Sequence, residues 1–179
     1  RKVEIGLVAA LALGLMYTVT VYIAWTRGFG AVVEPWLRIP PEDYYFYETF
    51  FALPVYLTIY VTLAGVTHLV LRGLGGTGSF EDAFAVVCIT STLPTFLFMW
   101  VPETALLVVL SGARAESLGG FPGIPGWVDT LRQLVVPVWI IAASILALGR
   151  IHAVAHWRVA VALLVGLVPG VTIALTYIR

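Results

Sequence analysis

Five stretches of this 179-residue chain each run for about 17 to 23 residues without an Asp, Glu, Lys or Arg. At ~1.5 Å of rise per residue, a helix of that length crosses the ~30 Å hydrocarbon layer of a bilayer. The whole chain is 60% hydrophobic and only 11% charged, and its mean hydropathy is +0.98. Soluble globular domains do not have this composition. The sequence therefore predicts an integral membrane protein with almost no soluble part.

The charged residues that flank these stretches set the limits of the predicted helices, which are residues 5–26, 49–71, 83–101, 133–149 and 159–178. The third helix either continues through an apolar piece to residue 110 or is followed by a segment that dips into the membrane. The fourth is short, so it requires little tilt or a locally thin bilayer. We predict an all-α, polytopic transmembrane bundle of about five spans, forming one domain over residues 1–179.

Five spans place the two termini on opposite sides of the membrane. Each side carries five basic residues, but those on the C-terminal side are spread over longer loops that are rich in acidic residues and in aromatic side chains such as Trp25, Trp36 and Trp100. The positive-inside rule and the denser basic loops favour a cytoplasmic N-terminus. The aromatic side chains mark the membrane interface on the other side.

Composition argues against several function classes. The formal net charge is zero, so the chain lacks the basic surface that nucleic-acid binding requires. The only cysteine, Cys88, lies in an apolar run and cannot form an intramolecular disulfide. The sequence contains no H-E-x-x-H zinc motif and no G-x-S-x-G nucleophile elbow. We assign no catalytic residue and no cofactor from the sequence.

Histidines and arginines gather on the side predicted to be cytoplasmic. A neutral imidazole that donates to a phosphate, with arginines as charge partners, suits an anionic lipid headgroup. The predicted lipid or anion site consists of His68, Arg72, Arg150, His152, His156 and Arg158. The less favoured alternative is a metal site, because His152 and His156 would share one face if residues 150–158 were helical. That site would need a further ligand.

Small residues predict close helix contacts. Gly166 and Gly170 form a G-x-x-x-G in the fifth span, and Gly6 and Gly14 lie on one stripe of the first. The glycine-rich loop over residues 73–82 lacks the Lys of a phosphate-binding loop. We expect Ser79 to be the N-cap of the third helix.

Several features recur along the chain from Tyr44 onward: the aromatic run 44–51 followed by Pro54, the glycine-rich loop 74–83, Pro94, Trp139, the turn 149–152 and Ala160. In these features the segment resembles the Yip (Ypt-interacting protein) domain family of five-span membrane proteins. This resemblance implies a cytoplasmic N-terminus. In eukaryotes the family is associated with vesicle trafficking and small-GTPase partners, usually through a cytosolic N-terminal arm. The sequence from Arg1 onward contains no such arm, and the short loops lead us to expect a bacterial or archaeal relative in the cell membrane.

The predicted function is that of a non-enzymatic, Yip-like membrane protein in membrane organisation or trafficking. Its expected partners are membrane lipids, including anionic ones, and a membrane protein or a second copy of the chain. One alternative is a small permease or channel component that uses the proline-containing spans. The other is a metal-dependent membrane enzyme that uses the histidine cluster.

Overall fold

The computed structural model describes residues 1–31, 36–109 and 126–178, and every regular element in these ranges is helical. The elements are α1 (Lys2–Thr26), α2 (Pro41–Gly73), α3 (Phe80–Thr95), the π-helical turn η1 (Phe96–Trp100), α4 (Val101–Val109), α5 (Gly126–His152) and α6 (His156–Tyr177). Five helices are long and apolar enough to cross a membrane, with α3, η1 and α4 forming the single span Phe80–Val109. The prediction of a five-span, all-helical membrane protein is confirmed.

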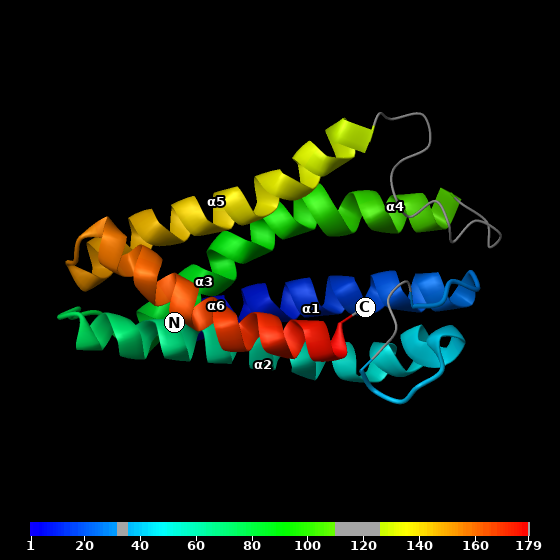
Figure 1. Ribbon diagram of the computed structural model, residues 1–179, viewed down its shortest axis with the longest axis horizontal. Helices are drawn as coiled ribbons and strands as arrows, with labels where there is room; N and C mark the ends of the chain where they lie inside the picture. Colours follow the sequence, from blue (N-terminus) through cyan, green and yellow to red (C-terminus); the bar gives the residue numbers. More distant parts are fainter. Residues whose placement is uncertain (32–35, 110–125, 179) are drawn as a thin grey trace.

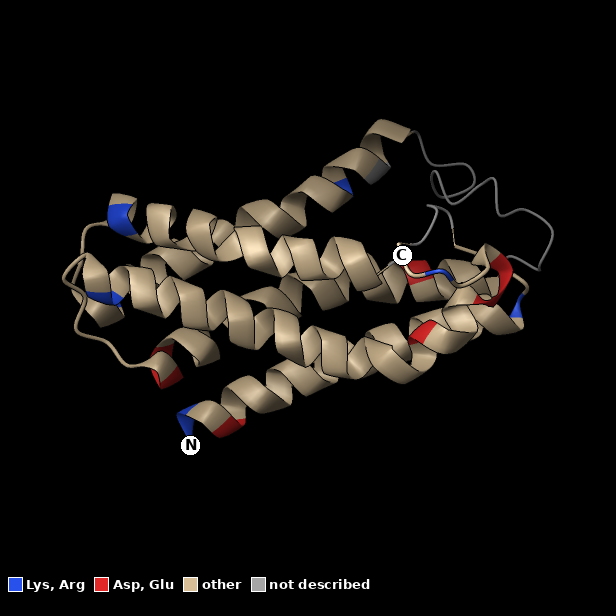
Figure 2. Cartoon of the chain, turned by 60° about the horizontal axis from the view of Figure 1, so that its bottom comes forward, with Lys and Arg blue, Asp and Glu red and all other residues tan. Residues whose placement is uncertain are grey.

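The spans run side by side (Figure 1), and α2 is in contact with α1, α3 and α6. Helix α5 packs on α3 and α6, and its N-terminal part leans away from the rest of the bundle (Figure 1). Charged residues are concentrated toward the two ends of the bundle, with a long uncharged region between them (Figure 2). The outer surface there exposes large apolar side chains such as Val8, Leu15, Leu164 and Val168. This distribution matches a bilayer around the middle of the bundle.

Two helices begin well before the predicted boundaries. Helix α2 starts at Pro41 rather than Thr49, and α5 starts at Gly126 rather than Gln133. Proline suits the first turn of α2 because its missing N–H would be unpaired there anyway. The acidic side chains of Glu42 and Asp43 in that turn stabilise the helix by interacting with the positive end of its dipole. The predicted fourth helix was too short, because α5 has 27 residues. The expectation of little tilt or a locally thin bilayer rested on that short length.

The third span is one continuous helix to Val109, which decides the alternative that the sequence left open. Pro102 has no N–H, so it cannot bond the carbonyl of Phe98 one turn earlier. The guanidinium of Arg132 on α5 donates to that carbonyl oxygen. A side chain from the neighbouring span thus satisfies the polar group that the proline leaves free, as is common for prolines in transmembrane helices.

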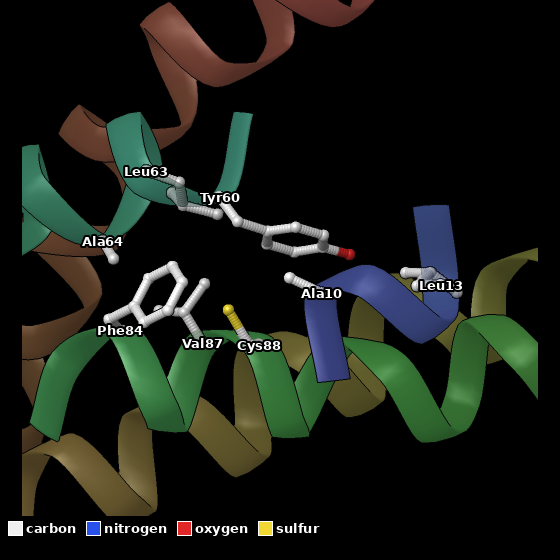
Figure 3. Packing of buried hydrophobic residues seen from close by; sticks show 8 residues of the cluster. All are labelled: Ala10, Leu13, Tyr60, Leu63, Ala64, Phe84, Val87 and Cys88. Atoms are coloured by element: carbon white, nitrogen blue, oxygen red, sulfur yellow. The ribbon is translucent and has the colours of Figure 1, made fainter. Parts of the chain in front are cut away.

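The core between α1, α2 and α3 combines small residues with a few large ones. Figure 3 shows the side chains of Ala10, Leu13, Tyr60, Leu63, Ala64, Phe84, Val87 and Cys88, all of them buried. The thiol of Cys88 packs as an apolar group in this cluster.

Glycines bring the helix backbones close together at several crossings. A Cβ added to Gly6 would lie 2.9 Å from the ring of Phe84, and one added to Gly14 would lie 2.7 Å from a methyl of Leu53. A Cβ on Gly166 would lie 2.4 Å from Thr67 Oγ1, whereas one on Gly170 would find nothing closer than 3.8 Å. The structure therefore places Gly6, Gly14 and Gly166 in tight contacts, and Gly170 in a looser one.

Candidate functional site at the histidine end

We call the end of the bundle that contains the α2–α3 loop (residues 74–79) and the α5–α6 turn (residues 153–155) the histidine end. The loop is held by short-range bonds: the Gly76 N–H donates to Leu71 O at 2.8 Å, and Gly75 has a φ of +90°, which glycine adopts without strain. These contacts fold the loop back onto the last turn of α2.

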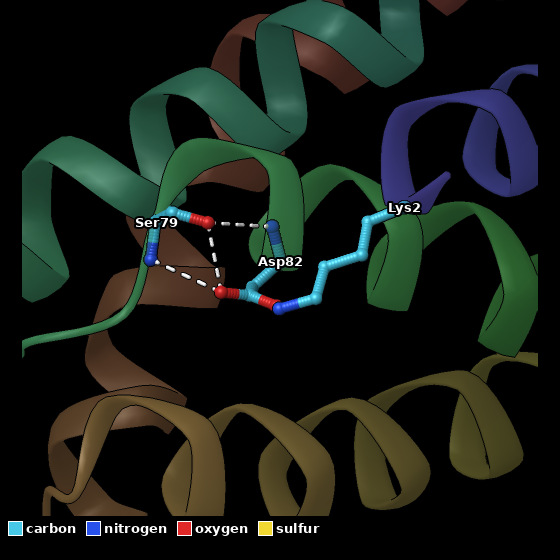
Figure 4. A network of polar contacts seen from close by, with 3 residues as sticks. All are labelled: Lys2, Ser79 and Asp82. Carbon is cyan, nitrogen blue, oxygen red and sulfur yellow. Dashed lines mark hydrogen bonds and ion pairs between the residues drawn. The ribbon is translucent and has the colours of Figure 1, made fainter.

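A capping box starts α3, as the sequence predicted for Ser79. The Asp82 N–H donates to Ser79 Oγ at 3.2 Å, and the Ser79 N–H donates to Asp82 Oδ2 at 3.3 Å. The other carboxylate oxygen accepts from Lys2 Nζ at 2.6 Å (Figure 4). The N-terminus of α1 is thereby tied to the start of α3.

The α5–α6 turn separates His152 from His156. Helix α5 ends at His152, Ala153 has a φ of +54°, and α6 begins at His156. The two histidines would share one helix face only if residues 150–158 were helical, and this condition is not met, because the chain leaves the helix between them. His152 is fully buried, whereas His156 is exposed and lies against Gly149.

The ring of His152 fills the space beside two loop glycines. A Cβ on Gly76 would lie 2.9 Å from His152 Nδ1, and a Cβ on Gly78 would lie 2.8 Å from Nε2. The backbone carbonyl of His152 accepts from the Thr77 N–H at 3.1 Å. The glycines are needed here because the imidazole occupies the volume that their side chains would take.

His68 of α2 completes a histidine pair. Its ring centroid lies 5.8 Å from that of His152 and 6.2 Å from that of Phe80. Within the described part of the chain, His68 Nδ1 and both ring nitrogens of His152 are buried and have no hydrogen-bond partner. A neutral imidazole carries one donor and one acceptor, and a buried polar atom left unpaired costs about 1–3 kcal/mol. The pair therefore has unused capacity for a small polar ligand.

The three arginines of the predicted site have different positions. Arg158 Nη1 donates to Leu74 O at 2.8 Å, and its guanidinium carbon lies 5.5 Å from the ring centre of Trp157. This contact ties the start of α6 to the α2–α3 loop. Arg72 and Arg150 are exposed, and neither has an ion-pair partner among the residues that the structure describes. Of the three arginines of the predicted site, Arg72 and Arg150 are thus the two whose guanidinium groups are exposed and without a partner among the described residues.

One face of α5 forms a shallow, open apolar groove, and Arg150 follows one helical turn beyond its last residue, Leu146. The groove is lined by Val135, Val138, Trp139, Ala142, Ala143 and Leu146. Residues 135, 139, 143, 146 and 150 follow each other at spacings of three or four, so they share one face of the helix. A cationic group thus closes an apolar stripe that faces outward.

The opposite end holds a buried carboxylate that sequence reasoning missed. Glu48 was placed at a helix boundary, but it lies inside α2, is 0% exposed and accepts a hydrogen bond from Tyr17 Oη at 2.8 Å. The ring of Tyr17 packs against Tyr56 and Trp100, with centroids 5.1 and 4.7 Å away. The only available signal was the adjacent run of tyrosines, which supplies hydroxyl groups that can pair with a buried carboxylate.

Glu103 of α4 is paired with Arg132 of α5 at 3.4 Å. Both side chains are partly buried.

Comparison with known proteins places the chain in a family. The searches of curated proteins and of solved structures returned no match. The family model for the Yip1 domain matches residues 4–178, nearly the whole chain. The match covers all five membrane-spanning helices and both turns of the histidine end. This multi-pass membrane protein belongs to the Yip1 domain family.

Proposed function

We propose that this protein is a non-enzymatic, membrane-organising protein that binds anionic phospholipid at the histidine end. The observation that carries the proposal is the position of Arg150 at the end of the apolar groove on α5. A phospholipid has the same pattern, because a charged headgroup adjoins an apolar acyl chain. The groove accepts the chain, and Arg150 binds the phosphate.

The charge distribution supports an anionic ligand at this end. It carries five basic side chains, those of Arg1, Lys2, Arg72, Arg150 and Arg158, against the three acidic ones of Glu4, Glu81 and Asp82. Since the cytoplasmic leaflet of a membrane is enriched in anionic lipids, we propose that the histidine end and the N-terminus face the cytoplasm. The proposal is consistent with a bacterial or archaeal cell membrane.

We further propose that this lipid binding serves membrane organisation or trafficking. A protein that holds anionic lipid beside exposed apolar helices can recruit a membrane partner or a second copy to the same patch of bilayer. The exposed apolar residues of α5 outside the groove, such as Leu134 at 53% and Ile141 at 40% exposure, are the surface that such a partner would cover.

The test measures bound lipid. The purified protein is exchanged into mixed micelles that contain phosphatidylglycerol or phosphatidylcholine, and the retained lipid is counted by native mass spectrometry. At about 1 kcal/mol per basic residue, the variant Arg72→Gln/Arg150→Gln should bind phosphatidylglycerol roughly thirtyfold more weakly, with phosphatidylcholine unchanged.

The matched control is Arg27→Gln/Arg38→Gln, which removes two exposed arginines at the other end of the bundle. It should retain the preference for the anionic lipid. The proposal is refuted if the Arg72→Gln/Arg150→Gln variant binds phosphatidylglycerol as tightly as the control variant and the original chain do. A further variant, Trp139→Ala, should weaken the binding of both lipids, because it removes part of the groove rather than the charge.

A further inference from the structure

We propose that His68 and His152 bind a divalent transition metal ion of the class that prefers imidazole, with Zn²⁺ as the representative. The proposal begins with the three buried ring nitrogens of this pair that have no hydrogen-bond partner in the described residues. His152 is 0% exposed, and buried polar atoms are nearly always paired with protein, water or an ion.

The distance between the rings fits two ligands of one metal ion. A zinc–nitrogen bond is about 2.1 Å long, which places the metal about 3.2 Å from the centre of each imidazole ring. Two rings on one metal then have centroids separated by at most about 6.4 Å. The separation of 5.8 Å between His68 and His152 lies inside this limit, so the metal can bridge them with little movement.

The surroundings hold the more buried ligand in place. Gly76 and Gly78 have no side chains, and the imidazole of His152 occupies the space that a Cβ at either position would need. The Thr77 N–H also donates to the His152 carbonyl. Such contacts fix the orientation of a metal ligand in the way that outer contacts do in known sites. His68 is half-buried, so it provides the side from which an ion can enter.

The rest of the coordination sphere would be water. The described residues contain no group of three or more His, Cys, Asp or Glu side chains placed to hold one metal ion. Asp82 and Arg72 lie within electrostatic reach of His152 and act on a cation in opposite directions. The geometry therefore points to an exchangeable site with two protein ligands and open positions, which differs from a closed structural zinc site.

A bound ion would connect two spans at the histidine end. His68 belongs to α2, and His152 is the last residue of α5. Because the ion binds the folded chain and needs both helices in place, it should raise the unfolding temperature.

The test uses the full chain in detergent, freed of metal by a chelator and carrying no histidine tag. Zn²⁺ titration should show one ion per chain, and His68→Gln should weaken this binding at least tenfold. The control His156→Gln removes the exposed histidine outside the pair and should leave the affinity unchanged. Cu²⁺ serves as a spectroscopic probe, and its electron paramagnetic resonance spectrum should show coupling to two imidazole nitrogens.

The substitution His152→Gln removes a buried ring and can unfold the chain, so the decision rests on His68→Gln. If His68→Gln binds Zn²⁺ as the original chain does, or if the Cu²⁺ spectrum shows no imidazole nitrogen, the proposal is overturned. The same holds if His156→Gln abolishes the binding, because the ion would then sit outside the pair. The lipid measurement is separate from these readouts, so either proposal can fail alone.

Discussion

At the histidine end, short backbone turns join the helices above an apolar cluster without aromatic residues, whereas at the opposite end large aromatic side chains form the cluster. The histidine end uses the Gly76 to Leu71 bond, the Thr77 to His152 bond and the capping box of Ser79. The other end, which we call the aromatic end, packs Tyr17, Val21, Ala24, Phe29, Tyr44, Tyr45, Ala52 and Leu107 into one cluster. Glu48 lies within the same region and is bonded to Tyr17.

This difference predicts which kind of substitution destabilises each end of the bundle. Backbone turns and glycine contacts leave no room for an added carbon, so a single methyl group disturbs them. Aromatic packing distributes its stabilisation over many atoms, so the loss of one polar group is partly absorbed. Three substitutions test this contrast.

The largest effect is expected for Gly166→Ala, at the glycine contact between the middle of α6 and α2. The new Cβ would lie 2.4 Å from Thr67 Oγ1 and 3.0 Å from the Leu63 carbonyl oxygen, so α6 must move away from α2. We expect a loss of about 2–3 kcal/mol of unfolding free energy, in the range found for overpacked cores. Equilibrium unfolding by SDS in mixed micelles measures it.

The matched control is Gly170→Ala, one turn further along the same helix. Its Cβ would meet atoms at ordinary contact distances of 3.8–4.0 Å, and alanine favours a helix by up to ~1 kcal/mol over glycine. Equal destabilisation by both substitutions would show that the close approach at Gly166 does not determine the stability of this interface.

A smaller effect is expected at the aromatic end for Tyr17→Phe. The substitution keeps the ring between Tyr56 and Trp100 but removes the 2.8 Å bond to the buried Glu48. Loss of a buried hydrogen bond to a carboxyl group should lower the unfolding free energy by about 1–2 kcal/mol. The control Tyr22→Phe removes a hydroxyl from a half-exposed ring. A Tyr17→Phe protein as stable as the control would mean that this bond contributes nothing.

The smallest effect is expected for Ser79→Ala, which removes the side-chain cap of α3. Loss of a serine N-cap costs about 1 kcal/mol in other helices. Thermal unfolding in detergent measures it, with Thr172→Ala as the control, because the Thr172 hydroxyl only bonds back to Val168 O within α6. A loss as large as that of Gly166→Ala would show that the cap of α3 contributes as much to stability as the close contact between α6 and α2.

The number and order of the spans could be predicted from the sequence because charge-free stretches report the thickness of the bilayer. Their limits could not, since the rule treats every charged residue as a boundary. Glu48 and Arg132 lie inside helices: a tyrosine hydroxyl binds the first, and the Phe98 carbonyl that Pro102 leaves free binds the second. Such compensation depends on a neighbouring helix, which the local sequence does not contain.

The sequence predicted which residues lie at the histidine end, but not how these residues contact one another. The sequence places all three histidines and three arginines on one side, and the structure brings His68 and His152 together there. It could not show that Ala153 adopts a positive φ, which ends α5 and separates His152 from His156. Nor could it show that Arg158 is bound to Leu74, because that contact joins segments far apart in the chain.

The π-helical turn Phe96–Trp100 determines how the third span tolerates changes in length. A π turn holds one residue more than an α turn, so deletion of one residue within it leaves a regular helix with α4 still facing its neighbours. Deletion at a regular turn of α3 would instead rotate everything that follows by about 100°. Thr104, whose hydroxyl lies 2.7 Å from that of Thr20 on α1, would keep its partner in the first case and lose it in the second. Chains one residue shorter at this turn can therefore have the same bundle.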